Sequence, residues 1–412
     1  MRAPRRLVEA GLTVMLLSAP VSISGTQIGL AIAAAGALWE TVLLRSVPRT
    51  PFDEPVLTLL AVTLASALAS EAPRAALSRF AGSWTILTMY LVVGWLGTPQ
   101  RLERFLRLFL VPAVIVGLYG IVQHFTGWNF LRSGDNSGLH SLELGSRTVF
   151  FPRGGFSHYQ TYANVFFILF CLASGLAAGS SGRSRIVRGG VAALLGLAVV
   201  FSFTRGIWLA LLAALAIFVR AFAPRAAPAV AGIGAAAILT VLLVPSSLRT
   251  RALSMADAGT NVERLLLWET AWNMLRDRPL LGVGVGNYRR HQSDYIRSEV
   301  PLRMTRTHAH NIWLQAAVER GVLGMLALLW LAVAVVGEAF RAVGRLPAGG
   351  LPHALAAGSF AALSGFLIDG FVQNNFGDSQ VALLFWLVAG IVVVCGRSGS
   401  TPTVPAAAEA GR

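Results

Sequence analysis

The sequence predicts an all-α integral membrane protein with about 12 transmembrane helices. Hydrophobic residues make up 55% and charged residues 13% of its 412 residues, whereas an ordinary soluble domain is about 25% charged. Apolar stretches long enough to cross a bilayer, about 20 residues, recur along the whole chain. The connections between these stretches are alternately rich and poor in arginine, as the positive-inside rule requires of a multi-pass membrane protein.

Twelve stretches qualify or nearly qualify as membrane spans. They cover approximately residues 7–24, 26–44, 55–71, 75–96, 104–125, 158–178, 186–203, 206–222, 226–244, 311–336, 351–370 and 380–397. The first follows a basic N-terminus and could be a signal peptide, but it lacks a small-x-small cleavage site. Another apolar stretch follows at once, so we expect an uncleaved first helix.

The net charge of +15 is carried by arginine, because the chain contains no lysine. A basic chain can indicate nucleic-acid binding, but no RNP motif, zinc finger or helix-turn-helix pattern is present. Arg-rich connections follow every second span, so the positive-inside rule places them and both termini in the cytoplasm. We therefore expect a multi-pass protein of the bacterial cell inner membrane that binds no nucleic acid.

This topology divides the chain into six segments. They are the first five spans (1–126), an outer loop (127–157), spans six to nine (158–244), a large outer loop (245–310), the last three spans (311–397) and a cytoplasmic tail (398–412). The Ala/Pro/Gly-rich composition of the tail predicts disorder. The large outer loop is rich in arginine, and an anionic ligand would explain that excess.

Within the large loop, residues 261–276 have apolar side chains at three- and four-residue spacing, which predicts a helix. The stripe consists of Val262, Leu265, Trp268, Trp272 and Leu275. Such a helix could lie at the membrane interface or form the core of a small extracytoplasmic cap, and the pattern does not separate these two interpretations.

Arg205 lies between two apolar stretches, at the outer membrane boundary in this topology. A boundary arginine is costly and indicates function, although a helix-end arginine can also simply extend to water. Gly206 permits a tight re-entry of the chain, which favours function. Arg264, in the amphipathic segment, would by itself be a solvent-facing residue.

His308 and His310 open the tenth span. On a helix two histidines at this spacing point to different faces, and no Cys or Glu stands at a matching offset, which argues against zinc. A neutral histidine at an aqueous boundary suits general-base catalysis near pH 7. Glu319, further along the same apolar segment, should pair with a partner such as arginine.

Other polar residues would face the same side. Residues 153–159 end the first outer loop, and Asp369, Gln373, Asn374, Asn375 and Asp378 follow the eleventh span. The glycine-rich stretch 277–287 resembles a phosphate loop only superficially, and close backbone packing explains its glycines better. No DxD motif is present, so arginine rather than a metal would neutralise a diphosphate.

In the motifs that contain these residues, the chain resembles the O-antigen ligase and O-antigen polymerase family of bacterial membrane glycosyltransferases. The motifs are Thr204-Arg205-Gly206, the pair Arg264 and Trp268, residues 277–284, and His308 to Gln315 followed by Glu319-Arg320-Gly321. Each motif is short, but their order and spacing together are fairly specific. The densest part covers about residues 190–335.

The resemblance implies a GT-C-type fold and a metal-independent enzyme without a cofactor, acting at the periplasmic face. The donor would be a glycan on undecaprenyl diphosphate. The acceptor would be lipid A–core for a ligase, another lipid-linked glycan for a polymerase, or a protein in an O-glycosyltransferase. Arg205 and Arg264 would hold the diphosphate, and His310, or else His308, would be the catalytic base. Further substrate-binding candidates are Arg153, His158, Asn311 and Arg278.

A transporter or flippase is the alternative of a different class. Transporters place charged residues and broken helices near the bilayer midplane, often in related halves. In this sequence the polar groups cluster at one face of the predicted bundle and no repeated halves are evident, so the sequence favours the enzyme. Membrane lipids are the remaining expected partner.

Overall fold

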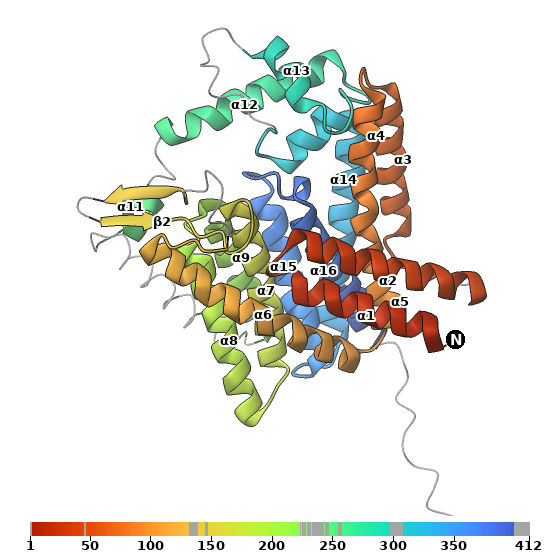
Figure 1. The fold of residues 1–412 in the computed structure, drawn as a ribbon, viewed down its shortest axis with the longest axis vertical. Coiled ribbons are helices and arrows are strands. Elements are labelled where there is room, and N and C mark those ends of the chain that lie inside the picture. The colour runs from red at the N-terminus through yellow and green to blue at the C-terminus, as the bar shows by residue number, and fades with distance from the viewer. Residues whose placement is uncertain are drawn as a thin grey trace, which may run out of the picture.

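The computed structural model describes residues 2–44, 47–131, 139–144, 147–222, 247–253, 258–296 and 308–398, with residues 224, 228, 232 and 243 between them. The helices of the N-terminal part are α1 (Arg2–Ser18), α2 (Ile23–Leu44), α3 (Asp53–Ala69), α4 (Pro73–Ala81), η1 (Gly82–Ile86), α5 (Leu87–Trp95) and α6 (Pro99–Thr126). A hairpin of β1 (Ser141–Leu144) and β2 (Arg147–Phe150) follows α6 (Figure 1).

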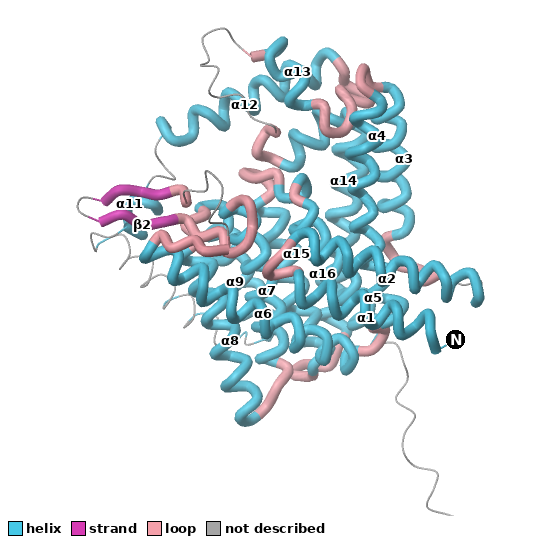
Figure 2. The backbone as a smooth tube through the Cα atoms, in the orientation of Figure 1, coloured by secondary structure: helices cyan, strands magenta, loops and turns pink. Residues whose placement is uncertain are grey.

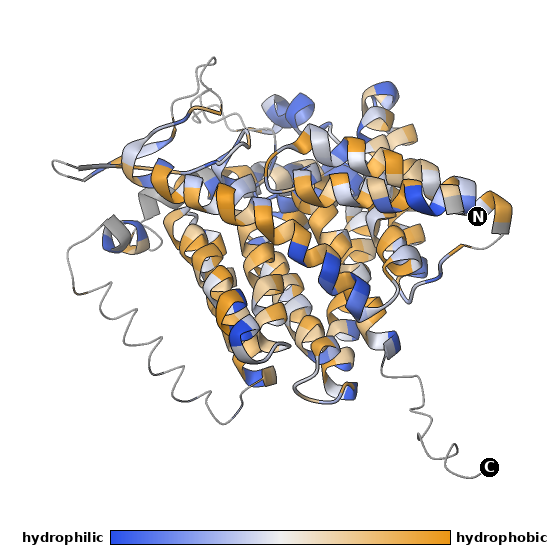
Figure 3. Ribbon diagram, turned by 60° about the horizontal axis from the view of Figure 1, so that its bottom comes forward, coloured by the Kyte–Doolittle hydropathy of each residue, from blue (hydrophilic) through white to orange (hydrophobic). Residues whose placement is uncertain are grey.

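The rest of the chain is also helical. Its elements are α7 (Tyr159–Ala178), α8 (Gly182–Phe201), α9 (Arg205–Phe222), α11 (Ser247–Leu253), α12 (Ala258–Asp277), α13 (Tyr288–Tyr295), α14 (Ile312–Arg345), α15 (Leu351–Asp369), η4 (Asn375–Gly377) and α16 (Ser379–Ser398). Figure 3 shows mostly apolar residues along the helices and polar residues gathered towards their ends. The predicted all-α membrane architecture is therefore confirmed.

Nine helical segments in the described part of the chain are long and apolar enough to cross a membrane. They coincide with nine of the twelve predicted spans, and α4, η1 and α5 together form one of them. Two further predicted spans correspond to α1 and α3, which have 17 residues each and fall just short of the required length. The predicted span 226–244 and nearly all of the tail 398–412 lie outside the described residues, so the count of twelve stays a prediction.

The centre of the bundle consists of α7, α15 and α16. In their membrane-length windows 83%, 67% and 89% of the residues are buried, against 22% in α8 and in α9, which therefore lie at the periphery. Aromatic side chains fill the space between the central helices, as in the packing of Phe366 with Phe376 and Phe385. A well-packed centre gives rigid support to the loops at its ends.

The outer loop 127–157 contains a β-hairpin that the sequence did not predict. β1 and β2 pair antiparallel, with Leu142 opposite Val149, and form a hairpin at one side of the molecule (Figure 2). The hairpin packs on the end of α6, where His124 contacts the backbone oxygen of Phe150 at 2.7 Å. The loop is thereby held against the bundle.

The large loop folds as a cap over α14, as Figure 1 shows for α12 and α13. The predicted helix 261–276 is confirmed as α12, but Val262, Leu265 and Trp272 of the predicted stripe are exposed. Leu275 of the stripe is buried, and the inner face of α12 also packs through residues outside the stripe. They are Ala271 and Met274, which cluster with Val283, Tyr288 and Val318. The helix thus has both a buried and an exposed apolar face.

The glycine-rich stretch after α12 joins the cap to a break in α14, where Gly321 is non-helical with φ 69°. Val283 N donates to Val318 O at 2.9 Å, and Val322 N donates to Pro279 O at 2.7 Å. A Cβ atom on Gly282 would collide with the backbone of α14, so only glycine permits this approach. Close backbone packing is therefore the role of this stretch, as predicted.

Glu319 secures the same junction as a buried carboxylate. Its Oε1 accepts from Gly286 N at 2.9 Å and from Gln315 Nε2 at 2.8 Å. Its Oε2 lies 3.4 Å from the guanidinium of Arg320. The prediction that Glu319 pairs with a partner is confirmed, and the pairing ties the cap to α14.

Candidate active site

One cavity of about 680 Å³ lies where the ends of several helices meet beneath the cap. Its lining comes from the segment before α7, the first residues of α7 and α9, the cap helix α12, the turn before α14, and the connection between α15 and α16. Five of the eight residues proposed from the sequence line it. They are His158, Arg205, Arg264, His308 and His310.

The connection between α15 and α16 reaches the same cavity. Gln373, Asn374, Asn375 and Asp378 line it together with the arginines and histidines. Asp369, which the sequence analysis placed in the same group, is fully buried and does not line the cavity. Three of the contributing helices, α7, α9 and α14, begin at this end of the bundle. Their N-terminal dipoles add positive potential there, which favours an anion.

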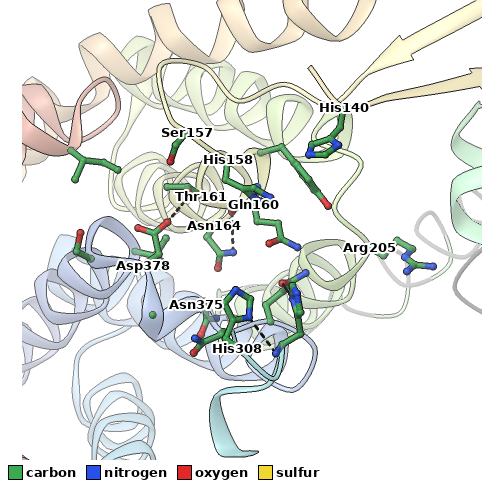
Figure 4. Close-up of a pocket in the computed structure, with 18 of the residues that line it drawn as sticks. His140, Ser157, His158, Gln160, Thr161, Asn164, Arg205, His308, Asn375 and Asp378 are labelled. Carbon is green, nitrogen blue, oxygen red and sulfur yellow. Dashed lines mark hydrogen bonds between the residues drawn. The ribbon is translucent and has the colours of Figure 1, made fainter. Parts of the chain in front are cut away.

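Arg205 takes its position from a strained turn between α8 and α9. Phe203 has a positive φ of 56°, an unusual conformation for a bulky residue, and its side chain is fully buried. Gly206, the next residue of α9, lies so close to Asp369 that a Cβ atom would collide with the carboxylate. The turn is thus fixed on both sides of Arg205, which begins α9 facing the cavity (Figure 4).

Arg251 of α11 reinforces this turn. Its Nε donates to Phe203 O at 2.9 Å, and its guanidinium lies 4.9 Å from the centre of the Phe151 ring. The side chain therefore links the cap, the first outer loop and the turn that carries Arg205. Burial, together with repulsion from Arg205 and Arg264, lowers the pKa of Arg251 to about 10. Three arginines are therefore close enough to repel one another, and an anion between them would relieve that repulsion.

Arg264 enters the cavity from α12, and its helix is connected to the histidine turn. Trp268, one helical turn further on, donates from Nε1 to Ala309 O at 3.1 Å. Because Ala309 lies between His308 and His310, this bond sets the position of both histidines relative to Arg264. The two motif residues Arg264 and Trp268 thus have different tasks: one lines the cavity and the other positions the turn.

His308 and His310 lie in a turn that is held at several points. Ala309 N donates to Gln315 Oε1 at 2.8 Å, and Ile312 N donates to Gly370 O at 2.8 Å. His310 has a positive φ of 49°, and its ring lies 4.3 Å from that of His308 in an edge-to-face arrangement. Strained backbone at two cavity-lining turns, this one and that of Phe203, is typical of functional sites.

Gln373 defines the hydrogen bonding of the His310 ring. Nδ1 of His310 lies 3.2 Å from Gln373 Oε1, an atom that can only accept. The tautomer protonated at Nδ1 would donate to this oxygen and leave Nε2 unprotonated. His308 instead uses its Nδ1 to accept from the backbone N of His310 at 3.4 Å.

His158 caps α7 and also lines the cavity. Its Nδ1 accepts from Gln160 N at 3.2 Å, and its ring stacks on Tyr159 with centroids 4.5 Å apart. His140, near the start of the hairpin, lines the cavity beside it. Because Nδ1 of His158 is an acceptor here, its Nε2 presents a donor.

Three residues proposed from the sequence do not line the cavity. Asn311 caps α14, since its Oδ1 accepts from Trp313 N at 2.9 Å and from Leu314 N at 3.0 Å. Arg278 forms an ion pair with Glu71, which fastens the end of α12 to the segment after α3. The backbone N of Arg153 donates to Gln123 Oε1 at 3.1 Å, which orders the loop before α7. In this structure these residues support the cavity from outside.

Several cavity residues were not proposed from the sequence as site residues. Asn164 and Thr161 belong to α7, whose apolar character conceals them, although an Asn within a membrane span is itself a functional signal. Arg251, which supports the Phe203 turn without lining the cavity, was one of many arginines in the large loop and no pattern distinguished it. Among the described residues, no three His, Cys, Asp or Glu side chains are grouped so that they could hold a metal ion.

The fold and the cavity together define a multi-pass membrane protein with an arginine- and histidine-lined site beneath a helical cap. Residues 190–329 match the family model described as O-Antigen ligase. This match to the O-antigen ligase family model confirms the resemblance found in the motifs. Arg205, Arg264, His308 and His310 all lie within the matched segment.

The other comparisons add little to this family assignment. No curated protein matches the chain. Among solved structures, it is similar to a chain described under "Structural coordination of polymerization and crosslinking by a peptidoglycan synthase complex". The identity is 14%, the TM-score is 0.48, and the match covers 85% of this chain and 98% of that chain. We draw nothing further from a likeness at this level.

Proposed function

We propose that the protein is a metal-independent glycosyltransferase of the O-antigen ligase type with a GT-C-like fold. It transfers a glycan from undecaprenyl diphosphate to a hydroxyl of lipid A–core at the periplasmic face of the inner membrane. The observation that carries this proposal is the placement of Arg205 and Arg264 in one cavity with His310, whose Nδ1 lies 3.2 Å from Gln373 Oε1.

The arginines bind the leaving group. As the glycosidic bond breaks, its electron pair passes to the diphosphate oxygen and negative charge accumulates there. Guanidinium groups already in place stabilise that charge without reorganisation of solvent. They form paired hydrogen bonds to phosphate oxygens, so no metal ion is required for neutralisation. Burial and the charges of Arg205 and Arg264 lower the pKa of Arg251, and a bound anion would offset the repulsion between these charges.

His310 acts on the acceptor. Its Nε2 takes the proton of the attacking hydroxyl while the oxygen forms the new bond to the anomeric carbon. Gln373 holds the opposite ring nitrogen and so stabilises the imidazolium that results. Attack opposite the departing diphosphate inverts the anomeric centre. The proton moves to His310 and the electron pair moves to the diphosphate, so the step is balanced.

Reconstituted transfer tests the mechanism. Purified protein is incubated with an undecaprenyl-diphosphate-linked glycan and lipid A–core, and the product is followed by gel mobility. His310→Ala should reduce the rate at least about 100-fold, since general-base catalysis contributes about 10²–10⁴. His353→Ala is the matched control, because His353 lies at the other end of α15, remote from the cavity. Full activity of His310→Ala would refute the assignment of the base.

Two further measurements test the metal and the acceptor. Transfer should continue in EDTA, and a loss restored by Mg²⁺ would refute metal independence. Deletion of the gene should remove long glycan from lipid A–core while lipid-linked polymer remains. Accumulation of single lipid-linked repeat units would instead identify a polymerase, and glycan missing from a secreted protein would identify a protein O-glycosyltransferase.

A further inference from the structure

The cavity has two chemically different walls. Arg205 lies at one side, whereas Asn164, Asn375 and Asp378 lie at the other, as Figure 4 shows. Asn164 is 3% exposed and Asn375 is 4% exposed. The side-chain oxygens of both asparagines are buried and have no hydrogen-bond partner within the described structure. Two unsatisfied buried acceptors in residues that line one cavity are rare in folded proteins.

The orientation of the Asn164 amide is fixed by its surroundings. Nδ2 donates to Gln160 O at 3.1 Å and to Asp369 Oδ2 at 3.2 Å. The Gln160 backbone oxygen can only accept, so a flipped amide would place oxygen against oxygen. Oδ1 of Asn164 therefore remains an acceptor that requires a donor from elsewhere. Asp369, which is fully buried behind it, acts as the support for this arrangement.

Asn375 is oriented in the same way from η4. Its Nδ2 donates to Phe366 O at 2.8 Å, which again leaves Oδ1 as the acceptor. Beside it, the Thr161 hydroxyl donates to Asp378 Oδ2, while Asp378 Oδ1 accepts from Gln380 N at 2.9 Å. The wall as a whole consists of oriented oxygens of asparagine, threonine and aspartate.

Such a wall selects its ligand by chemistry. A phosphate would meet amide oxygens and a carboxylate, so an anion is repelled from this side. A polyhydroxylated ring offers several O–H donors at once, and each hydroxyl can also accept. Sugar hydroxyls therefore match two fixed acceptors better than a charged or an apolar group does.

The position of the wall indicates which sugar it holds. In-line displacement places the acceptor hydroxyl on the side of the anomeric carbon away from the diphosphate. The diphosphate belongs with Arg205 and Arg264, so the acceptor belongs at the opposite wall. Gln373, hydrogen-bonded to His310, lies only two residues before Asn375 on the same connection. A sugar on Asn375 would thus present its hydroxyl near the base.

We propose that Asn164 and Asn375 form the hydroxyl-binding part of the acceptor subsite, which holds the sugar ring that receives the glycan. This inference rests on the proposed function. Asn164 and Asn375 both lie outside residues 190–329, the segment matched by the family model, whereas the arginines and histidines lie within it. The recognition of the acceptor therefore comes from a different part of the chain than the catalytic groups.

Acceptor binding without donor is the first test. Lipid A–core from a strain that lacks long glycan is titrated into purified full-length protein in nanodiscs, with tryptophan fluorescence as the readout. Asn164→Ala and Asn375→Ala should each raise the dissociation constant about tenfold, because one hydrogen bond to a buried acceptor is lost. Asn273→Ala on α12, outside the cavity lining, should leave the constant unchanged. Unchanged binding in both cavity variants overturns the proposal.

Kinetics then separates the acceptor wall from the diphosphate wall. The two asparagine variants should raise KM for the acceptor and leave KM for the donor within about twofold. An equal rise of both KM values would mean a general structural defect and overturns the subsite. If the wild-type protein binds lipid A–core but transfers no glycan to it, the proposed transfer reaction is refuted, whereas the proposed acceptor subsite is not. If one of the two asparagine variants does not fold, as judged by size-exclusion chromatography and thermal unfolding, the binding and kinetic results of the other asparagine variant test the proposal.

Discussion

The charge of Arg264 provides the sharpest test of the arginine wall. Arg264 and Arg276 lie on the same helix, α12, but Arg264 lines the cavity while Arg276 is exposed at the end of the helix. Replacing either arginine by glutamine removes one positive charge from the same element. The two variants therefore have the same net charge and differ only in whether the cavity has lost a guanidinium.

The expected loss of diphosphate affinity follows from the hydrogen bonds that the Arg264 guanidinium would form with the diphosphate. A hydrogen bond between charged partners contributes about 1.5–3 kcal/mol, so Arg264→Gln should weaken binding of the diphosphate roughly 10- to 100-fold. Relief of the repulsion with Arg251 reduces this loss, because one cation of the cluster has gone. Arg276→Gln should change binding by less than about twofold, since exposed charges are screened by salt.

Undecaprenyl diphosphate without a glycan is the probe, and its dissociation constant is measured in nanodiscs at two salt concentrations. The same variants are then compared in kcat/KM for transfer. Because the probe is the released leaving group and already carries the charge that develops as the bond breaks, the loss in its binding should be at least as large as the loss in kcat/KM. Equal effects of Arg264→Gln and Arg276→Gln would refute a specific anion site, and so would an Arg264→Gln variant with full affinity.

Three other substitutions probe the supports of the cavity. Arg251→Met should lower kcat/KM about tenfold while the protein stays folded, because the Phe203 carbonyl loses its hydrogen-bond donor. Transfer assays measure kcat/KM, and circular dichroism shows whether the variant is folded. Gly206→Ala should abolish folded protein because the new Cβ meets the Asp369 carboxylate, and Asp369→Ala in the same chain should restore expression. Glu319→Ala should destabilise the cap by about 3–5 kcal/mol, as removal of one partner from a buried pair does; limited proteolysis of the large loop measures it.

The membrane spans were predictable because one physical requirement, the thickness of the bilayer, sets both the length and the apolar content of a helix. The grouping of Arg205, Arg264 and His310 was expected from the family resemblance, because Arg264 by itself would be a solvent-facing residue and only Arg205 stood out as a costly charge at the membrane boundary. Their neighbours were not predictable, because a residue beside a motif can serve packing instead. Asn311 is an example: asparagine is a favoured helix cap, and the start of α14 uses it as one.

Other features depend on contacts between distant segments. The β1–β2 hairpin consists of two four-residue strands, too short for a clear alternation of apolar and polar residues. Arg251 became distinct only when the fold brought it to Phe203, 48 residues earlier in the chain. The apolar stripe of α12 was visible in the sequence, yet the sequence could not show that its inner face also packs through Ala271. A pattern gives a periodicity, and tertiary contacts decide which side is buried.

The arrangement of the cavity gives a physical reason for the strained turns at Phe203 and at His310. A transfer that moves negative charge to one side and a proton to the other needs cations and a base on different, independently fixed segments. Phe203 sets the start of α9 and therefore Arg205, while the turn at His310 aims the ring before α14 begins. Each residue adopts a backbone conformation that costs about 1–3 kcal/mol, and each is held by hydrogen bonds from another segment: Arg251 to Phe203, and Gln373 to His310. Folding of the cap and the bundle therefore positions these side chains before any substrate binds. The free energy of substrate binding is then not needed to order them.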